Sequence, residues 1–188
     1  KELKMAFRKR AAELLRPLLA RTGWEAKPGE PSAMALLRDR LIPTLGHLGD
    51  AAIAGDATRY AETAFKTDSQ VTGSIREAAL NIWAYQADAA RWDMLHERAR
   101  TETGPVARQQ FYNLLGSARD PGLAQKALTL ALTDEAPVPM RALIIFAVAQ
   151  EHPEMAFDWA VNHADQVNAL VEESAKANFI VRLAWQSS

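Results

Sequence analysis

Apolar residues recur along this chain at the three- and four-residue spacing that lines one face of an α-helix. The clearest stripe consists of Ile75, Ala78, Ala79, Ile82 and Trp83. Similar stripes run through residues 107–118, 140–148 and 167–174. No segment shows a sustained alternation of apolar and polar residues, so the pattern predicts an all-α protein without strands.

Turn-forming and capping residues divide these stripes into about ten short helices. Asp50, Asp88 and Asp120 each stand where a helix N-cap is wanted, and Pro121 suits the first helical position after Asp120. The expected helices lie near residues 2–21, 31–47, 50–66, 72–86, 88–102, 105–117, 120–133, 138–151, 153–163 and 164–184.

Short helices joined by short connections are typical of antiparallel helix pairs. The three capping aspartates recur at intervals of 38 and 32 residues, close to the length of a two-helix repeat. The pattern therefore favours a HEAT- or armadillo-like curved stack rather than a regular solenoid. No low-complexity linker interrupts it, so we expect residues 1–188 to form a single helical domain.

Composition agrees with this fold and limits the function. The chain holds 36 Ala and 21 Leu against 15 Val plus Ile, which favours helices. A net charge of -1 gives no general attraction to nucleic acid or membrane, and no apolar run is long enough to span a bilayer. The absence of cysteine fits a reducing compartment, and we expect a cytoplasmic protein. The chain does not begin with Met, so we expect an excised piece of a longer polypeptide.

Catalytic chemistry has little support in the sequence. His96 and Glu97 start like a zinc-protease HExxH motif, but Arg100 stands where the second histidine would be. His47, His152 and His163 show no ligand spacing, and we expect them at caps or on the surface. The sequence therefore predicts no catalytic, metal-binding or cofactor-binding residue in this chain. Arg76, Arg108 and Arg141 are candidates to meet a peptide carboxylate, although we favour solvated surface positions for them.

The first helix is basic and amphipathic. Leu3, Phe7, Leu14 and Leu18 run along one side, among several Lys and Arg residues. Such a helix can serve as a surface for RNA or an anionic membrane. We favour instead an amphipathic helix packed on the core or on a missing upstream domain.

Irregular glycines set residues 14–50 apart from ordinary helical sequence. Gly23 suits a helix end that needs positive φ, and Trp24 suits the junction that follows. Gly49 stops the next helix, and Asp50 caps its successor. Glu30 lies at a helix start with Arg38 two turns on, so we hypothesise that these two side chains pair with each other or with another domain.

Three segments resemble the C-terminal helical domain of the gluzincin zinc aminopeptidases, the group of the puromycin-sensitive and endoplasmic-reticulum aminopeptidases and their bacterial relatives. The segments are Leu14–Asp50, Leu114–Leu128 and Ala156–Asn162. The residues that carry the family's pattern read as structural and are Gly23, Trp24, Glu30, Leu37, Arg38, Gly49, Asp50, Asp120, Pro121 and Trp159.

The resemblance implies a non-catalytic domain that faces a thermolysin-like catalytic domain, encloses the active-site chamber and influences which peptides enter. It implies a parent protein that removes N-terminal amino acids from peptides, with zinc held by the missing catalytic domain. The family's HExxH and GxMxN motifs are absent here, so this chain alone should hydrolyse nothing. The expected partners are the upstream catalytic domain and, through the concave face, a peptide substrate. The alternatives are a stand-alone HEAT-like scaffold that binds a protein partner and, less favoured, a nucleic-acid binder.

Overall fold

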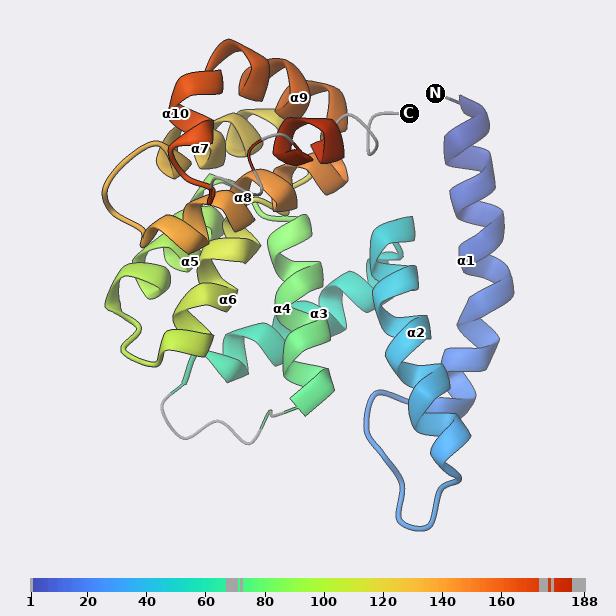
Figure 1. Ribbon diagram of the computed structural model, residues 1–188. Helices are drawn as coiled ribbons and strands as arrows, with labels where there is room; N and C mark the ends of the chain where they lie inside the picture. Colours follow the sequence, from blue (N-terminus) through green and yellow to red (C-terminus); the bar gives the residue numbers. More distant parts are fainter. Residues whose placement is uncertain (1, 67–70, 72, 173–175, 177, 184–188) are drawn as a thin grey trace. The chain divides into compact units, whose positions relative to one another are not determined.

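The computed structural model describes residues 2–66, 71, 73–172, 176 and 178–183. Ten α-helices are labelled in Figure 1, and no strand occurs among the described residues. The all-α fold class predicted from the sequence is confirmed. The helices are α1 (Glu2–Thr22), α2 (Ser32–Leu48), α3 (Ala51–Ala64), α4 (Gly73–Tyr85), α5 (Ala89–Thr101), α6 (Pro105–Leu115), α7 (Pro121–Ala131), α8 (Val138–Glu151), α9 (Pro153–Asn162) and α10 (Ala164–Asn168).

The expected helix over 164–184 is wrong as one continuous element. α10 ends at Asn168, and the backbone then turns through Ala169 and Leu170. Helical geometry returns at 176 and over 178–183, while 173–175, 177 and 184 lie outside the described residues. The apolar period continues across the break, which is why the sequence pattern alone missed it.

Helix ends follow the capping chemistry in the sequence. The carboxylates of Asp50 and Asp120 accept hydrogen bonds from the first backbone N–H groups of α3 and α7, and Asp88 accepts one from Arg91 at the start of α5. Pro121 occupies the first turn of α7. The N-cap predictions at all three aspartates are confirmed.

The chain separates into two compact units, residues 1–83 and 84–188. The single domain expected from the sequence stays a prediction. So does the curvature of a HEAT-like stack, although antiparallel helix pairs within each unit fit it.

In the first unit, α1 and α2 pack side by side, and α3 follows against α2 (Figure 1). Their core is made by small and branched apolar side chains from all three helices and from α4: Ala12, Leu19, Leu41, Ile42, Leu45, Ile53, Ala57 and Ile82. Gly46 allows the closest approach, because a Cβ there would lie 2.5 Å from Cγ1 of Ile82. The helices of this unit are thus held by tight apolar contact.

In the second unit, α5 packs on α6, and α8 packs on α6, α7 and α9. The Trp92 ring is buried and donates from Nε1 to the Leu115 carbonyl at 3.0 Å, which ties α5 to the end of α6. Gly116 lies where α6 meets α8, since a Cβ on it would be 2.7 Å from the Ile144 carbonyl oxygen. No helix in the described part of the chain is long and apolar enough to cross a membrane.

Candidate functional site

The buried guanidinium of Arg38 holds the connection between α1 and α2. Its Nε donates to the Gly23 carbonyl at 3.0 Å, and one terminal nitrogen donates to the Thr22 carbonyl at 3.1 Å. The two terminal nitrogens also bind the two carboxylate oxygens of Glu30 at 2.8 and 2.6 Å. The hypothesis that Glu30 and Arg38 pair with each other is confirmed.

This pairing stabilises the ionised forms of both side chains. The hydrogen bonds from Arg38, with help from the Lys27 backbone N–H, lower the pKa of Glu30 from 4.5 to about 2. The same carboxylate raises the pKa of Arg38. A guanidinium that binds a carboxylate and two carbonyls at once uses its planar fork fully, which a lysine could not do.

The backbone around this ion pair has the predicted form. Gly23 has φ 68° directly after α1, and its N–H donates to the Leu19 carbonyl at 2.7 Å. Gly49 has φ 82° at the C-cap of α2. Both glycines therefore occupy the left-handed region, which the sequence predicts for Gly23, and Gly49 ends its helix as expected.

Asp50 combines a cap with an ion pair. Its Oδ1 accepts from the backbone N–H groups of Ala52 and Ile53 at 3.0 and 3.2 Å, while Oδ2 accepts from Nε of Arg16 on α1. The Asp50 side chain is fully buried, so the Arg16 contact compensates its charge. α1 and the start of α3 are thereby fixed to each other.

Trp24 fills the junction predicted for it. Its ring stacks on Tyr60 with centroids 4.9 Å apart, and its Nε1 donates to Oδ2 of Asp56 at 3.2 Å. The Tyr60 hydroxyl donates to Glu25 at 3.0 Å, and burial together with this bond raises the pKa of Tyr60. The loop after α1 is therefore attached to α3.

A hollow of about 300 Å³ lies among these groups, between α1, the loop at Trp24 and the start of α3. Its polar lining comes from Arg16, Asp50 and Asp56, and the rest is apolar or small. Each of the three polar groups already binds another protein group. The arrangement has the character of a structural junction rather than of acid–base or nucleophilic chemistry.

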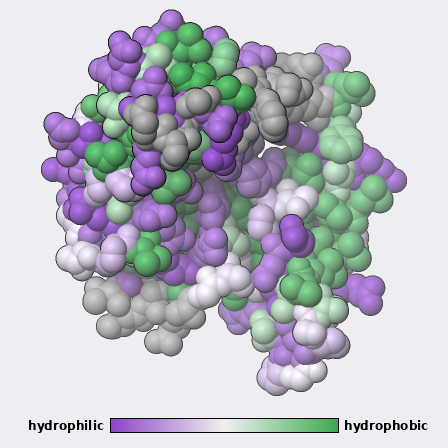
Figure 2. All heavy atoms as spheres, viewed as in Figure 1, coloured by the Kyte–Doolittle hydropathy of each residue, from purple (hydrophilic) through white to green (hydrophobic). Residues whose placement is uncertain are grey.

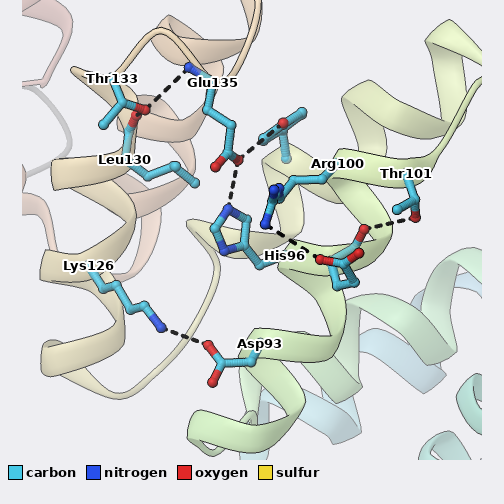
Figure 3. A network of polar contacts seen from close by, with 10 residues as sticks. Asp93, His96, Arg100, Thr101, Lys126, Leu130, Thr133 and Glu135 are labelled. Atoms are coloured by element: carbon cyan, nitrogen blue, oxygen red, sulfur yellow. Dashed lines mark hydrogen bonds and ion pairs between the residues drawn. The ribbon is translucent and has the colours of Figure 1, made fainter.

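A second polar cluster lies in the other unit, at the start of the α7–α8 connection (Figure 3). Nε2 of His96 contacts Oε1 of Glu135 at 2.7 Å, and the Tyr112 hydroxyl donates to the same oxygen at 3.3 Å. Nearby, Lys126 binds Asp93 at 2.7 Å and lies 4.1 Å from the Trp92 ring centre. Burial raises the pKa of Tyr112, which keeps its hydroxyl protonated and able to donate.

Glu135 was not predicted as a partner for His96. The two residues are 39 positions apart, and Glu135 lies in a proline-rich segment that the sequence marks only as a helix breaker. His96 is half-buried, because α5 brings it against this segment. No spacing signal in the sequence links them.

The remaining histidines contact backbone carbonyls. His47 and His163 contact carbonyls one turn earlier on their own helices, at 2.9 and 2.8 Å. His152 contacts the Ala118 carbonyl at 2.9 Å. No group of three or more metal-ligating side chains occurs among the described residues.

Of the other family-pattern residues, Leu37 belongs to the first unit, and Asp120, Pro121 and Trp159 belong to the second. Asp120 and Pro121 begin α7, and the buried Trp159 on α9 stacks on His163 with centroids 4.7 Å apart. Leu37 is 37% exposed and so contributes to the surface of α2. The structure thus brings six of the ten residues (Gly23, Trp24, Glu30, Arg38, Gly49 and Asp50) into one unit around the α1–α2 and α2–α3 connections.

Two of the cationic candidates are engaged within the protein. Arg141 donates to the Ala136 carbonyl at 2.6 Å and to Asp134 at 3.0 Å, so it secures the α7–α8 connection. Arg108 lies 5.7 Å from the Tyr112 ring centre, beside the His96 cluster. Neither has the open position of a dedicated carboxylate receptor.

The model of the family described as the ERAP1-like C-terminal domain matches residues 1–187. The chain belongs to this family. It is similar to two rice proteins (Oryza sativa subsp. japonica). Aminopeptidase M1-C is 25% identical over 175 residues, covering 90% of this chain and 20% of that protein. Aminopeptidase M1-D is 26% identical over 178 residues, covering 93% of this chain and 20% of that protein.

The resemblance to the C-terminal helical domain of the aminopeptidases is therefore confirmed. The chain spans about a fifth of the length of the curated relatives it matches. The family membership does not favour the alternative of a stand-alone scaffold.

Proposed function

We propose that this chain is the non-catalytic C-terminal domain of a zinc aminopeptidase, and that it encloses the active-site chamber and influences which peptides enter. The parent protein removes N-terminal amino acids from peptides. The match of the ERAP1-like C-terminal domain over residues 1–187 carries this proposal.

The chemistry of the described residues supports a structural role. The buried charged side chains of the first unit, Arg38 and Asp50, bind backbone groups of their own unit and each pairs with an opposite charge. Such a domain acts by shape: it excludes bulk water and limits the space available to the distal part of a peptide. Zinc and the water-activating glutamate belong to the catalytic domain of the parent.

The first test uses the chain alone. Purified chain should release no amino acids from peptides and should hold no stoichiometric zinc by elemental analysis. Hydrolysis that persists through purification, or tightly held zinc, would refute the assignment of the chemistry to another part of the polypeptide.

The second test uses the parent protein. We expect kcat/KM to depend strongly on peptide length in a series that keeps the same N-terminal residue and scissile bond. A parent truncated before this domain should lose that length discrimination and still cleave an aminoacyl amide substrate. Equal length discrimination in both forms would contradict the role in enclosing the chamber.

A further inference from the structure

One face of α1 exposes large apolar side chains. At about 100° per residue, these four positions fall within an arc of about 60° and extend about 22 Å along the helix. They are Leu3 (84% exposed), Phe7 (67%), Leu14 (58%) and Leu18 (38%). We call these four residues the α1 stripe. Leu3 and Phe7 are one turn apart, as are Leu14 and Leu18, and the half-buried Ala11 lies between the two pairs.

The α1 stripe is distinct from the face that α1 buries in its own unit. Ala12 and Leu19 enter the core beside α2 and α3, and they lie roughly 140° around the helix from the stripe. α1 therefore packs on the core of its unit, as expected from the sequence, but through Ala12 and Leu19 and not through the stripe. For the exposed stripe there remains the second expectation from the sequence, packing on a missing upstream domain.

A groove adjoins the α1 stripe. Its volume is about 500 Å³, and residues of both α1 and α2 line it: Phe7, Arg8, Pro43, Thr44, His47 and Leu48. Apolar atoms gather over the α1 region in Figure 2. A ridge of apolar side chains beside a groove is the surface on which another helix packs, with its own side chains in the groove.

The charges on α1 indicate which kind of helix can cover the stripe and the groove. α1 carries six basic residues against two acidic ones. Arg21 lies exposed at the edge of the stripe, and so does Arg10, which pairs with Glu13 of the same helix at 3.4 Å. A second copy of this chain would place like charges together along two such helices, which disfavours self-association. A helix with acidic residues beside its apolar face would complement both the stripe and its edge.

We propose that the α1 stripe is covered by an amphipathic α-helix of about four turns, flanked by acidic residues, from the part of the same polypeptide outside these 188 residues. Helical-repeat proteins bury the outer face of each helix pair against the neighbouring pair. The curated relatives are about five times longer than the segment they share with this chain, so they contain ample sequence for such a helix. The inference rests on the proposed function for the existence of a longer parent.

Thiol labelling tests the proposal directly, because the chain has no cysteine of its own. Leu14→Cys places a thiol in the stripe, and Lys9→Cys places a control thiol on an exposed position outside it. The labelling rate at each site is read by peptide mass spectrometry, in the 188-residue chain and in the intact parent. We expect labelling at position 14 to slow by about tenfold or more in the parent, while position 9 changes little.

The possible outcomes separate the proposals. Equal labelling of position 14 in both proteins would overturn this inference and leave the aminopeptidase assignment standing. Protection in the short chain that grows with its concentration would also overturn it, in favour of a second copy. Protection in a parent without a zinc-binding motif would uphold the helix partner and overturn the proposed function. When the stripe is protected, cross-linking from Leu14→Cys identifies the covering segment, and a segment without acidic flanks would overturn the charge argument.

Discussion

Replacing Arg38 by Met should destabilise the first unit more than the loss of any surface ion pair. Methionine keeps much of the side-chain volume and removes every donor. The Thr22 and Gly23 carbonyls and both oxygens of Glu30 then lose their partner in a site where Arg38 is only 4% exposed. Removing one partner of a buried ion pair costs about 3 to 5 kcal/mol, and we expect a loss of this size.

The assay is equilibrium unfolding in urea, followed by tryptophan fluorescence, since Trp24 lies in the loop that Arg38 fixes. Arg59→Met is the matched control: it removes an arginine that pairs with Asp56 from an exposed position of the same unit. The control should leave the urea midpoint nearly unchanged.

Exchanging the two charges should not rescue the fold. In the double variant Arg38→Glu with Glu30→Arg, the carboxylate at position 38 would face the carbonyl oxygens of Thr22 and Gly23. Like partial charges would then replace two hydrogen bonds, so the double variant should stay strongly destabilised. A loss below about 1 kcal/mol for Arg38→Met, or full recovery in the exchanged pair, would refute the view that Arg38 acts through the backbone as well as through Glu30.

Three further predictions concern stability. Because the pKa of Glu30 is lowered from 4.5 to about 2, the ionised Glu30 stabilises the fold fully above pH 4.5, and this stabilisation is lost as the pH falls toward 2. In parallel urea titrations, the free energy of unfolding of Glu30→Gln should therefore vary less over this pH range than that of the unmodified protein. Gly116→Ala should lower the free energy of unfolding by about 1 to 3 kcal/mol, because its Cβ would lie 2.7 Å from the Ile144 carbonyl oxygen. Gly55→Ala, in open space within α3, should raise the free energy of unfolding by about 1 kcal/mol. An equal gain in thermal stability at both sites would contradict the close approach of α6 and α8. In chemical denaturation, Asp50→Ala should lower the free energy of unfolding by about 2 kcal/mol and Asp88→Ala by about 1 kcal/mol. The loss is smaller at Asp88 because this residue caps an exposed helix start and has no buried ion pair. Equal losses would argue against a contribution from the Arg16–Asp50 ion pair.

Local rules in the sequence were sufficient for the helices and their ends. Asp50, Asp88 and Asp120 cap their helices as expected, and Gly23 and Gly49 adopt positive φ. These features depend on groups within four residues of each other, so a pattern in the chain can reveal them. The same rules failed beyond Asn168, where the apolar period continues although the helix does not.

Contacts between distant residues needed the tertiary structure. The Glu30–Arg38 pair could be suspected from its spacing, but the carbonyl partners of Arg38 depend on how α1 ends against α2. The contact between His96 and Glu135 has no signal in the sequence at all.

The amino-acid sequence by itself determined an all-helical chain, its capping residues and its kinship with the aminopeptidase C-terminal domains. Only the tertiary structure decided which face of α1 enters the core and which remains exposed as an apolar stripe. Both faces of that helix are apolar, so periodicity identifies them equally well. Burial depends on which other helices lie beside each face, and that is set by packing across the whole unit.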